Sequence, residues 1–321
     1  MEYGQVPEVA KPISRLVQGT IMVREDDIPG SFALLDAVFA QGCTAFDTAR
    51  HYGRGNEATV GRWLRQRDLR DLVVIIAKGA HHGPERQRVT PVDIAADLDE
   101  SLAQLGLETI DLYLLHRDDP AVPVGPIVEA LNDHLQAGKL RAFGGSNWTT
   151  ERIAAANAYA GAHGLVPFVA SSPQFSLAAQ AEPPWPGCVS IGGPAGAAAR
   201  EWYRRQRMPV FAWSSLAGGF LSGRYDRETL ASLTDPVAER TRRSYGTAAN
   251  FERLDRARAL AAERGLTVPQ VALAYVLAQP LDLYALVGSE SGEEFAANLA
   301  ASAVRLTPEE VEWLDLRRES R

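Results

Sequence analysis

Short apolar runs alternate along the chain with longer stretches in which apolar residues recur every three or four positions. The short runs have the length and the Val, Ile, Leu and Phe content of buried strands, and the longer stretches have the period of amphipathic helices. Strands that are apolar throughout and alternate with helices indicate a parallel sheet covered on both faces. The runs lie at residues 15–22, 44–49, 72–78, 110–116, 140–147, 168–174, 209–215 and 283–289.

Eight strand–helix units in a chain of this length are typical of an α/β fold of the (β/α)8 TIM barrel class. We therefore predict that residues 1–321 form a single barrel domain. Thr90 and Thr267 precede helical stretches and are followed closely by proline, so we expect both to be helix N-caps.

Two stretches show neither period, residues 176–196 and 222–246. They follow the sixth and seventh strands. In a barrel such segments are loops at the C-terminal face, where substrates bind. We expect long loops there that wall a pocket.

Composition narrows the kinds of partner. The net charge is −7, and 33 basic residues are dispersed among 40 acidic ones, which argues against a nucleic-acid or membrane partner. The chain shows no apolar signal region and no apolar segment long enough to span a membrane. Cys43 and Cys188 are too few for a disulfide framework and are expected as reduced thiols. These features predict a cytoplasmic enzyme or binding protein that acts on a small molecule.

The segment FDTARHYGRGNEATVG, residues 46–61, allows two interpretations. Gly53, Gly55 and Ala58 match the G-x-G-x-x-A pattern of a phosphate-binding turn. In a dinucleotide-binding fold, however, this turn directly follows the first strand, and the next strand ends in an acid. Three residues intervene here, and the next strand ends in Lys78. We interpret the match as accidental and expect the glycines to start a helix.

Ionisable or phenolic residues lie at or just beyond three consecutive strand ends: Asp47, Tyr52, Lys78 and His116. Each taken alone has an ordinary structural explanation, such as a turn, packing or solvation. In a barrel these ends converge on one mouth, so together they predict a catalytic site. A metal-dependent hydrolase is the weaker reading, because the other histidines form no converging ligand set, and no metal is expected.

Across nearly the whole length, the chain resembles the aldo-keto reductase superfamily. The resemblance is carried by FDTARHYG with NEATVG, VVIIAKG, DLYLLH, GKLRAFGGSNW, SSPQFSL, AWSSLAGGFLSGRY and GSESGEEFAANLAA. It implies a (β/α)8 barrel that binds an extended nicotinamide dinucleotide, and an NAD(P)-dependent oxidoreductase that interconverts carbonyls and alcohols. It also implies that Asp47, Tyr52, Lys78 and His116 form a catalytic tetrad.

The residue types suit that chemistry. Carbonyl reduction needs a proton donor as the alkoxide forms, and Tyr52 is the expected donor. The Lys78 ammonium should stabilise the phenolate and so lower the pKa of Tyr52. Asp47 should pair with Lys78 and hold it in place. His116 should donate a hydrogen bond to the substrate oxygen.

The resemblance also implies cofactor contacts. Ser146, Asn147 and Gln174 would hold the nicotinamide amide, and Trp213 would stack on its ring. Near Ser214, Leu216 and Gly218 the glycine-rich loop lets the backbone approach the pyrophosphate. Further expected contacts are Thr20, Asp47, Gly288, Ser289, Glu290, Glu294 and Asn298.

The choice between NAD(H) and NADP(H) depends on residues 288–298. This segment holds Glu290, Glu293 and Glu294 and no cation. A carboxylate repels a 2′-phosphate but accepts a hydrogen bond from a 2′-hydroxyl, which gives a slight lean to NAD(H). The alternative is that these glutamates only begin a helix.

Substrate contacts are expected from Met22, His51, Arg117 and Trp148, which follow strand ends or neighbour the tetrad. Mixed polar and aromatic walls suit a sugar, a sugar-derived aldehyde or a hydroxyketone. A second hypothesis is a cofactor-binding interaction module, similar to potassium-channel β-subunits.

Overall fold

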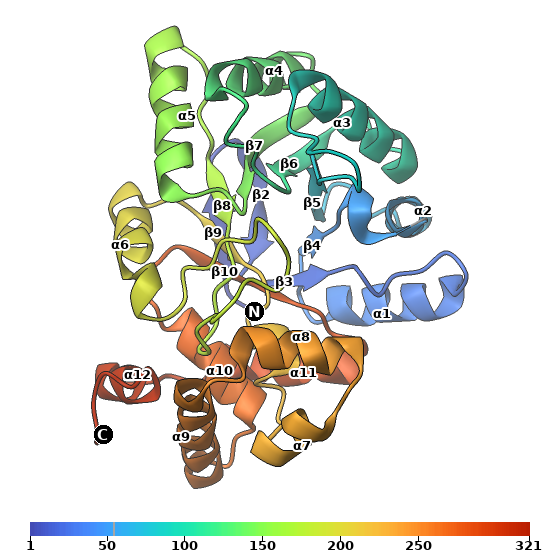
Figure 1. The fold of residues 1–321 in the computed structure, drawn as a ribbon. Coiled ribbons are helices and arrows are strands. Elements are labelled where there is room, and N and C mark those ends of the chain that lie inside the picture. Colours follow the sequence, from blue (N-terminus) through green and yellow to red (C-terminus); the bar gives the residue numbers. More distant parts are fainter. Residues whose placement is uncertain (54) are drawn as a thin grey trace.

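Parallel strands form a closed barrel in the computed structural model, which describes residues 1–53 and 55–321. The strands follow chain order around the ring, and β10 closes it by pairing with both β9 and β3. This confirms the predicted (β/α)8 class (Figure 1). In the described residues the barrel strands are β3 (Leu16–Gly19), β4 (Ala45–Asp47), β5 (Val74–Gly79), β6 (Ile110–Leu115), β7 (Leu140–Ser146), β8 (Ala170–Ser172), β9 (Val210–Ala212) and β10 (Leu283–Val287).

Helices surround this barrel on its outer face (Figure 1). Thr90 and Thr267 are N-caps as expected: each side-chain oxygen accepts a hydrogen bond from the backbone N–H three residues on. The helices are α1 (Ile28–Ala40), α2 (Asn56–Arg67), α3 (Pro91–Leu105), α4 (Val124–Gln136), α5 (Thr150–His163), α6 (Ala197–Gln206), α7 (Arg227–Ser232), α8 (Pro236–Tyr245), α9 (Ala248–Arg264), α10 (Val268–Leu277), α11 (Gly292–Ala301) and α12 (Pro308–Leu314).

The hydrophobic core has two layers because the barrel strands bury both faces. Val17, Val74 and Ile76 belong to the cluster inside the barrel. Ile75 and Leu115 belong to the larger cluster between the barrel and the helices. The all-apolar character of the strands follows from this double burial.

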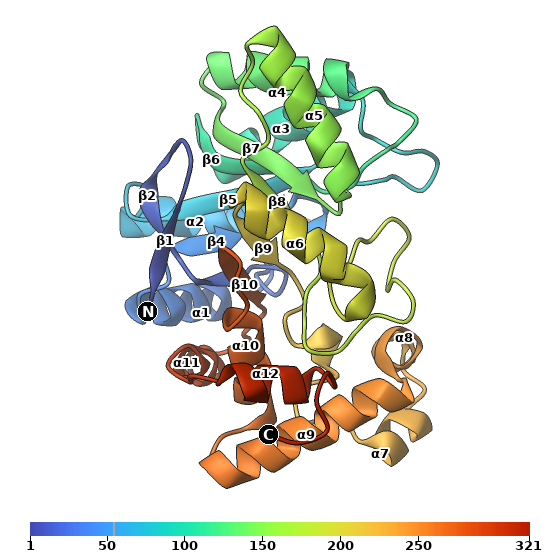
Figure 2. The same cartoon turned by 90° about the vertical axis from the view of Figure 1, so that its left-hand side faces the viewer.

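An antiparallel hairpin precedes the barrel, which the sequence analysis did not predict. Its strands are β1 (Tyr3–Val6) and β2 (Val9–Ser14). Val6, Val9 and Ile13 are buried in the same cluster as the barrel interior. In Figure 2 the hairpin lies on the left, opposite α8 and the loop that follows β8. The hairpin therefore covers the end of the barrel remote from the predicted mouth.

The two long segments after β8 and β9 differ from each other. Residues 176–196 are a loop with one short 3-10 turn, Pro194–Gly196, as expected. Residues 222–246 were expected to be irregular, and this was wrong: they contain α7 and α8. Asp226 and Asp235 cap these helices through their side chains. The helices are short and carry few apolar residues, so their period was too weak to detect.

None of the helices in residues 1–53 and 55–321 combines the length and the apolar character that crossing a bilayer requires. Cys43 and Cys188 are free thiols. That residues 1–321 form one domain stays a prediction.

Candidate active site

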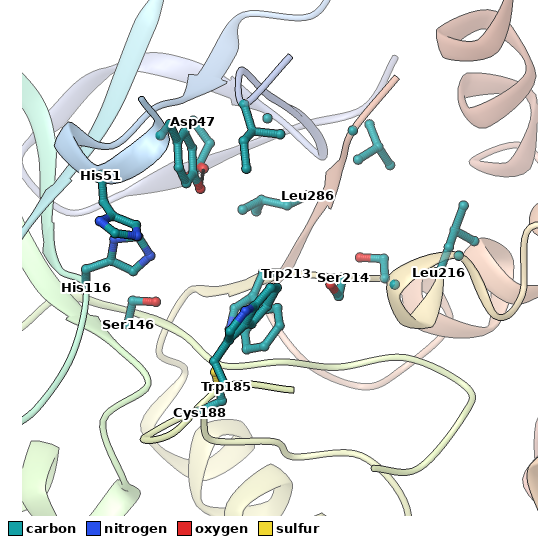
Figure 3. Close-up of a pocket in the computed structure, with 18 of the residues that line it drawn as sticks. Asp47, His51, His116, Ser146, Trp185, Cys188, Trp213, Ser214, Leu216 and Leu286 are labelled. Atoms are coloured by element: carbon teal, nitrogen blue, oxygen red, sulfur yellow. Dashed lines mark hydrogen bonds between the residues drawn. The ribbon is translucent and has the colours of Figure 1, made fainter. Parts of the chain in front are cut away.

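A cavity of about 960 Å³ opens at the C-terminal ends of the barrel strands. The tetrad residues Asp47, Tyr52, Lys78 and His116 all line it. Figure 3 shows His51 and His116 at one end, and Ser214 and Leu216 at the other. The predicted convergence of the strand ends is therefore what the structure shows.

Tyr52, Lys78 and Asp47 form a compact hydrogen-bonded group. Lys78 Nζ lies 2.5 and 2.6 Å from the two carboxylate oxygens of Asp47. It also donates to Tyr52 Oη at 3.0 Å, and Tyr52 Oη donates to Asp47 Oδ1 at 2.9 Å. Asp47 and Lys78 are almost fully buried. Such a buried ion pair needs good geometry and additional hydrogen bonds to offset the loss of hydration, and both are present.

A tight turn brings Tyr52 back over Lys78. After β4 the chain forms a 3-10 turn, Arg50–Tyr52, and the following Gly53 has a φ of 115°. Gly55 then begins α2 in the left-handed region. Both conformations favour glycine. The glycines thus shape the turn and start the helix, as expected from residues 46–61.

The pKa of Tyr52 lies well above its ordinary value, chiefly because burial disfavours the phenolate and secondarily because of Asp47. This direction is opposite to the one expected from Lys78 alone. Burial also lowers the pKa of Lys78, while Asp47 raises it. The phenol is therefore protonated at neutral pH, and the expectation that Lys78 would lower the pKa of Tyr52 is wrong.

His116 follows β6, and its backbone N–H donates to Gly79 O at 2.7 Å. Burial, and next the charge of Lys78, lower its pKa well below the ordinary value. Its ring is therefore neutral at pH 7 and carries a single N–H donor. The Tyr52 and His116 rings lie 6.1 Å apart between centroids, nearly perpendicular, which leaves both facing the cavity.

Most predicted cofactor contacts line the same cavity. They come from β4, from the ends of β7, β9 and β10, from the loops that follow β9 and β10, and from α11. They are Asp47, Ser146, Asn147, Trp213, Ser214, Leu216, Gly218, Gly288, Glu290, Glu294 and Asn298.

Three predicted cofactor contacts do not line the cavity. Thr20 is buried and donates to Asp47 O at 3.0 Å, so it supports the tetrad. Gln174 is buried, and its amide bonds to Ser176 Oγ and Ser190 Oγ. Ser289 is buried and accepts a hydrogen bond from Asn298 Nδ2 at 3.0 Å. Each of these side chains is satisfied within the protein.

The cavity fits an extended nicotinamide dinucleotide. Trp213 lines it with an indole N–H that has no hydrogen-bond partner among the described residues. Ser214, Ala217 and Gly218 adopt left-handed backbone conformations, with φ of 52°, 54° and 59°. For the two non-glycine residues this conformation is strained, and such strain gathers at ligand sites. The lining extends from His116 beside the tetrad to Asn298 on α11.

The predicted substrate contacts divide evenly. His51 and Arg117 line the cavity. Met22 is partly buried against the core and does not line it. Trp148 was expected at the mouth, but it is fully buried. Its indole N–H donates to Arg117 O at 3.1 Å, and its ring packs 5.0 Å from Phe168.

Several cavity residues were not predicted. His81, His82, Trp185, Cys188 and Arg224 all line it. The sequence could have indicated Arg224 as a cavity residue, because it is the basic residue that ends the glycine-rich loop. Trp185 and Cys188 lie in the loop after β8, whose path depends on tertiary packing. In residues 1–53 and 55–321, no group of three or more His, Cys, Asp or Glu residues is placed to hold a metal ion.

Comparison with known proteins identifies the family. The model described as "Aldo/keto reductase family" matches residues 15–317. Aldo-keto reductase str7 of Strobilurus tenacellus is 29% identical over 294 residues, which cover 90% of this chain and 81% of that protein.

Two relatives come from Schizosaccharomyces pombe. The aldo-keto reductase yakc, whose name carries NADP(+), is 28% identical over 274 residues, 83% of this chain and 76% of its own length. A putative voltage-gated potassium channel subunit beta is 26% identical over 295 residues, 85% of this chain and 80% of its own length.

The fold, the cavity and the family match agree with one another. The chain belongs to the aldo/keto reductase family, and it is an NAD(P)-dependent oxidoreductase that reduces carbonyl compounds.

Proposed function

We propose that this protein reduces a small aldehyde, ketone or sugar-derived carbonyl to the alcohol, with Tyr52 as the proton donor. The observation that carries the proposal is the position of Tyr52 Oη, 3.0 Å from Lys78 Nζ and facing the cavity beside His116. When bound, a nicotinamide dinucleotide supplies the hydride that the carbonyl carbon accepts.

Two side chains, His116 and Tyr52, act on the carbonyl oxygen of the substrate. The neutral His116 ring donates a hydrogen bond to it, and the Tyr52 hydroxyl donates the proton that converts the alkoxide to an alcohol. The hydroxyl hydrogen bonded to Asp47 reaches the substrate by rotation about the phenolic C–O bond. The high pKa of Tyr52 keeps this proton in place until negative charge develops on the substrate.

Lys78 acts on the product of that step. Proton transfer leaves a phenolate. A buried site destabilises this charged form unless a cation lies beside it. The Lys78 ammonium at 3.0 Å supplies that charge, and its bonds to Asp47 hold it there. Asp47 is thus a positioning residue, and reverse reaction on an alcohol uses the same groups.

Cofactor contacts are proposed for the cavity residues of β7, β9, β10 and α11. We keep the lean to NAD(H), because Glu290 and Glu294 line the cavity where the adenosine ribose is expected. Part of their role is local: Glu294 Oε2 accepts a hydrogen bond from Glu290 N, and Glu294 lies in the first turn of α11. Arg224, also on the cavity, is the cation best placed to favour a phosphate instead.

The test uses the purified wild-type protein with NADH and NADPH deuterated at C4 of the nicotinamide. Aldehydes, hydroxyketones and sugar aldehydes are added, and the products are examined by mass spectrometry. We expect deuterium on the carbinol carbon, with kcat/KM for NADH at least equal to that for NADPH. A kcat/KM for NADPH far above that for NADH would reverse the cofactor lean but leave the reductase proposal standing. Absence of deuterium from every product would refute the proposal.

A second candidate function is a cofactor-binding interaction module. Similarity to the putative potassium channel subunit favours it. Steady turnover of added carbonyls distinguishes the two, because a module needs no repeated release of oxidised cofactor. A cytoplasmic location stays a prediction.

A further inference from the structure

Arg117 is a buried cation that faces the cavity without an acidic partner. It follows His116 after β6, is 6% exposed, and lines the cavity. Its Nη1 donates to His116 O at 3.0 Å. No carboxylate in the described part of the chain forms an ion pair with it, and the acidic groups that act on it are Cys188 and Tyr52. Burial raises the pKa of both groups, so both are uncharged at neutral pH.

Nearby carboxylates are already engaged by other cations. Asp118, the next residue, accepts hydrogen bonds from Arg152 at 2.8 and 2.9 Å. Asp47 is held by Lys78. Arg253, which is as deeply buried as Arg117, has Asp315 at 3.5 Å. A buried guanidinium without a counter-charge is costly, so Arg117 is an exception to the pattern within this chain.

The surroundings of Arg117 leave its charge unbalanced. His51 and His81 stack with ring centroids 3.6 Å apart, and His81 lies 4.8 Å from His116. Burial, with Arg117 among the other causes, lowers the pKa of all three rings, that of His81 to about 4, so they are neutral at pH 7. Figure 3 shows this histidine end across the cavity from Leu216. Arg117 therefore places an unbalanced positive charge at the end of the cavity beside the tetrad.

We propose that the carbonyl substrate carries an anionic group, a carboxylate or a phosphate, which Arg117 binds while the carbonyl lies between Tyr52 and His116. The inference rests on the proposed reductase function. A planar guanidinium forms paired, charge-assisted hydrogen bonds with either anion. The ligand then supplies the missing counter-charge and selects for anionic aldehydes or ketones over neutral ones.

The first experiment compares three aldehydes on one ring with the wild-type protein and saturating cofactor. They are 4-carboxybenzaldehyde, 4-formylphenyl phosphate and the neutral methyl 4-formylbenzoate. A charge-assisted hydrogen bond in a buried site corresponds to a preference of about 10- to 100-fold. We expect kcat/KM for at least one anion to exceed that for the ester by this factor, chiefly through KM. Which anion is preferred identifies carboxylate or phosphate as the natural group.

Two variants then assign the preference to Arg117. Arg117→Met should reduce the anion-to-ester ratio of kcat/KM by about tenfold or more. Arg141→Met is the matched control, because Arg141 is exposed on β7 and its loss should leave the ratio unchanged. The ester reports folding and chemistry within each variant, so a general loss of activity does not alter the ratio.

The possible results distinguish failure of the anionic-substrate proposal from failure of the reductase proposal. Reduction of the ester as fast as both anions by the wild-type protein would refute the anionic substrate while leaving the reductase function intact. A ratio unchanged by Arg117→Met, or a rise only in the KM for the cofactor, would also refute it. If none of the three aldehydes is reduced, and none of the broader panel, both proposals fail.

Discussion

Three side chains share the space around one phenolic proton. The Tyr52 hydroxyl donates to Asp47 and accepts from Lys78. While the proton is present, burial and Asp47 keep it on the phenol. Once it has left, Lys78 faces a phenolate and its attraction becomes dominant. In the proposed mechanism the group therefore holds the proton before transfer and stabilises the oxyanion afterwards.

Glu57, on α2, is another buried ionisable group near the tetrad. It is 1% exposed, and burial raises its pKa from 4.5 to about 7, with Glu100 adding to the effect. The folded protein therefore binds a proton more tightly than the unfolded chain does. Stability from this source is complete below pH 4.5 and is lost as the pH rises to about 7.

Glu57→Gln should remove this pH dependence, because glutamine does not titrate. The free energy of unfolding of the variant, relative to wild type, should rise by up to about 3 kcal/mol between about pH 5 and pH 8. Urea denaturation at both pH values measures it. Glu108→Gln changes an exposed glutamate and is the control. A relative free energy of Glu57→Gln that is the same at both pH values would contradict the assignment.

At this scale the sequence predicted that Asp47, Tyr52, Lys78 and His116 would meet at one cavity, and it predicted the remaining lining residues less well. Asp47, Lys78 and His116 lie at strand ends, where barrel geometry alone decides their position. Trp148 and Gln174 also lie near strand ends, but their side chains turn into the protein and are satisfied there. The position of a residue along a strand does not show whether its side chain faces the cavity or turns into the protein. That orientation depends on hydrogen-bond and packing partners that are distant in the sequence.

Among the elements, α2 and α3 approach closely at a glycine. A Cβ atom at Gly61 would lie 2.0 Å from Leu105 O, at the end of α3. Position 61 therefore needs glycine although it lies within a helix. The pair of helices supports β4 and β5, which carry Asp47 and Lys78.

Gly61→Ala should destabilise the protein by about 1–3 kcal/mol, because the clash outweighs the higher helix propensity of alanine. Gly161→Ala in α5 is the matched control, since no heavy atom lies within 4 Å of its Cβ position. That control should gain about 0.5–1 kcal/mol. Thermal unfolding of both variants decides, and stabilisation by both substitutions would disprove the close approach.

Periodicity predicted the barrel strands because each is a long enough apolar run between helices. It missed the β1–β2 hairpin, whose strands alternate buried and exposed residues over few positions. It also missed α7 and α8, which depend on the Asp226 and Asp235 caps more than on an apolar face. Short elements of this kind take their structure from neighbours and caps.

On the scale of the whole molecule, the two ends of the barrel have different functions. The hairpin covers one end with Val6, Val9 and Ile13, and the cavity occupies the other. Stability and chemistry are thereby separated in space. Substitutions in the hairpin should therefore alter the stability of the protein without altering its catalysis.

Ile13→Ala tests this separation. Ile13 is fully buried, so the truncation should lower the free energy of unfolding by about 2–5 kcal/mol. The kcat of the variant, measured well below its unfolding temperature, should equal that of wild type. Ala10→Ser, on the exposed side of β2, should change neither quantity. A large loss of kcat in folded Ile13→Ala would show that the two ends are coupled.

The reductase account as a whole depends on the phenol of Tyr52. The decisive measurement is single-turnover reduction of a carbonyl by Tyr52→Phe, together with the dissociation constant of the dinucleotide. We predict a rate lower by about 10²- to 10⁴-fold, because only the proton donor is lost, and a dissociation constant within about twofold of wild type. A rate close to that of wild type would contradict the account.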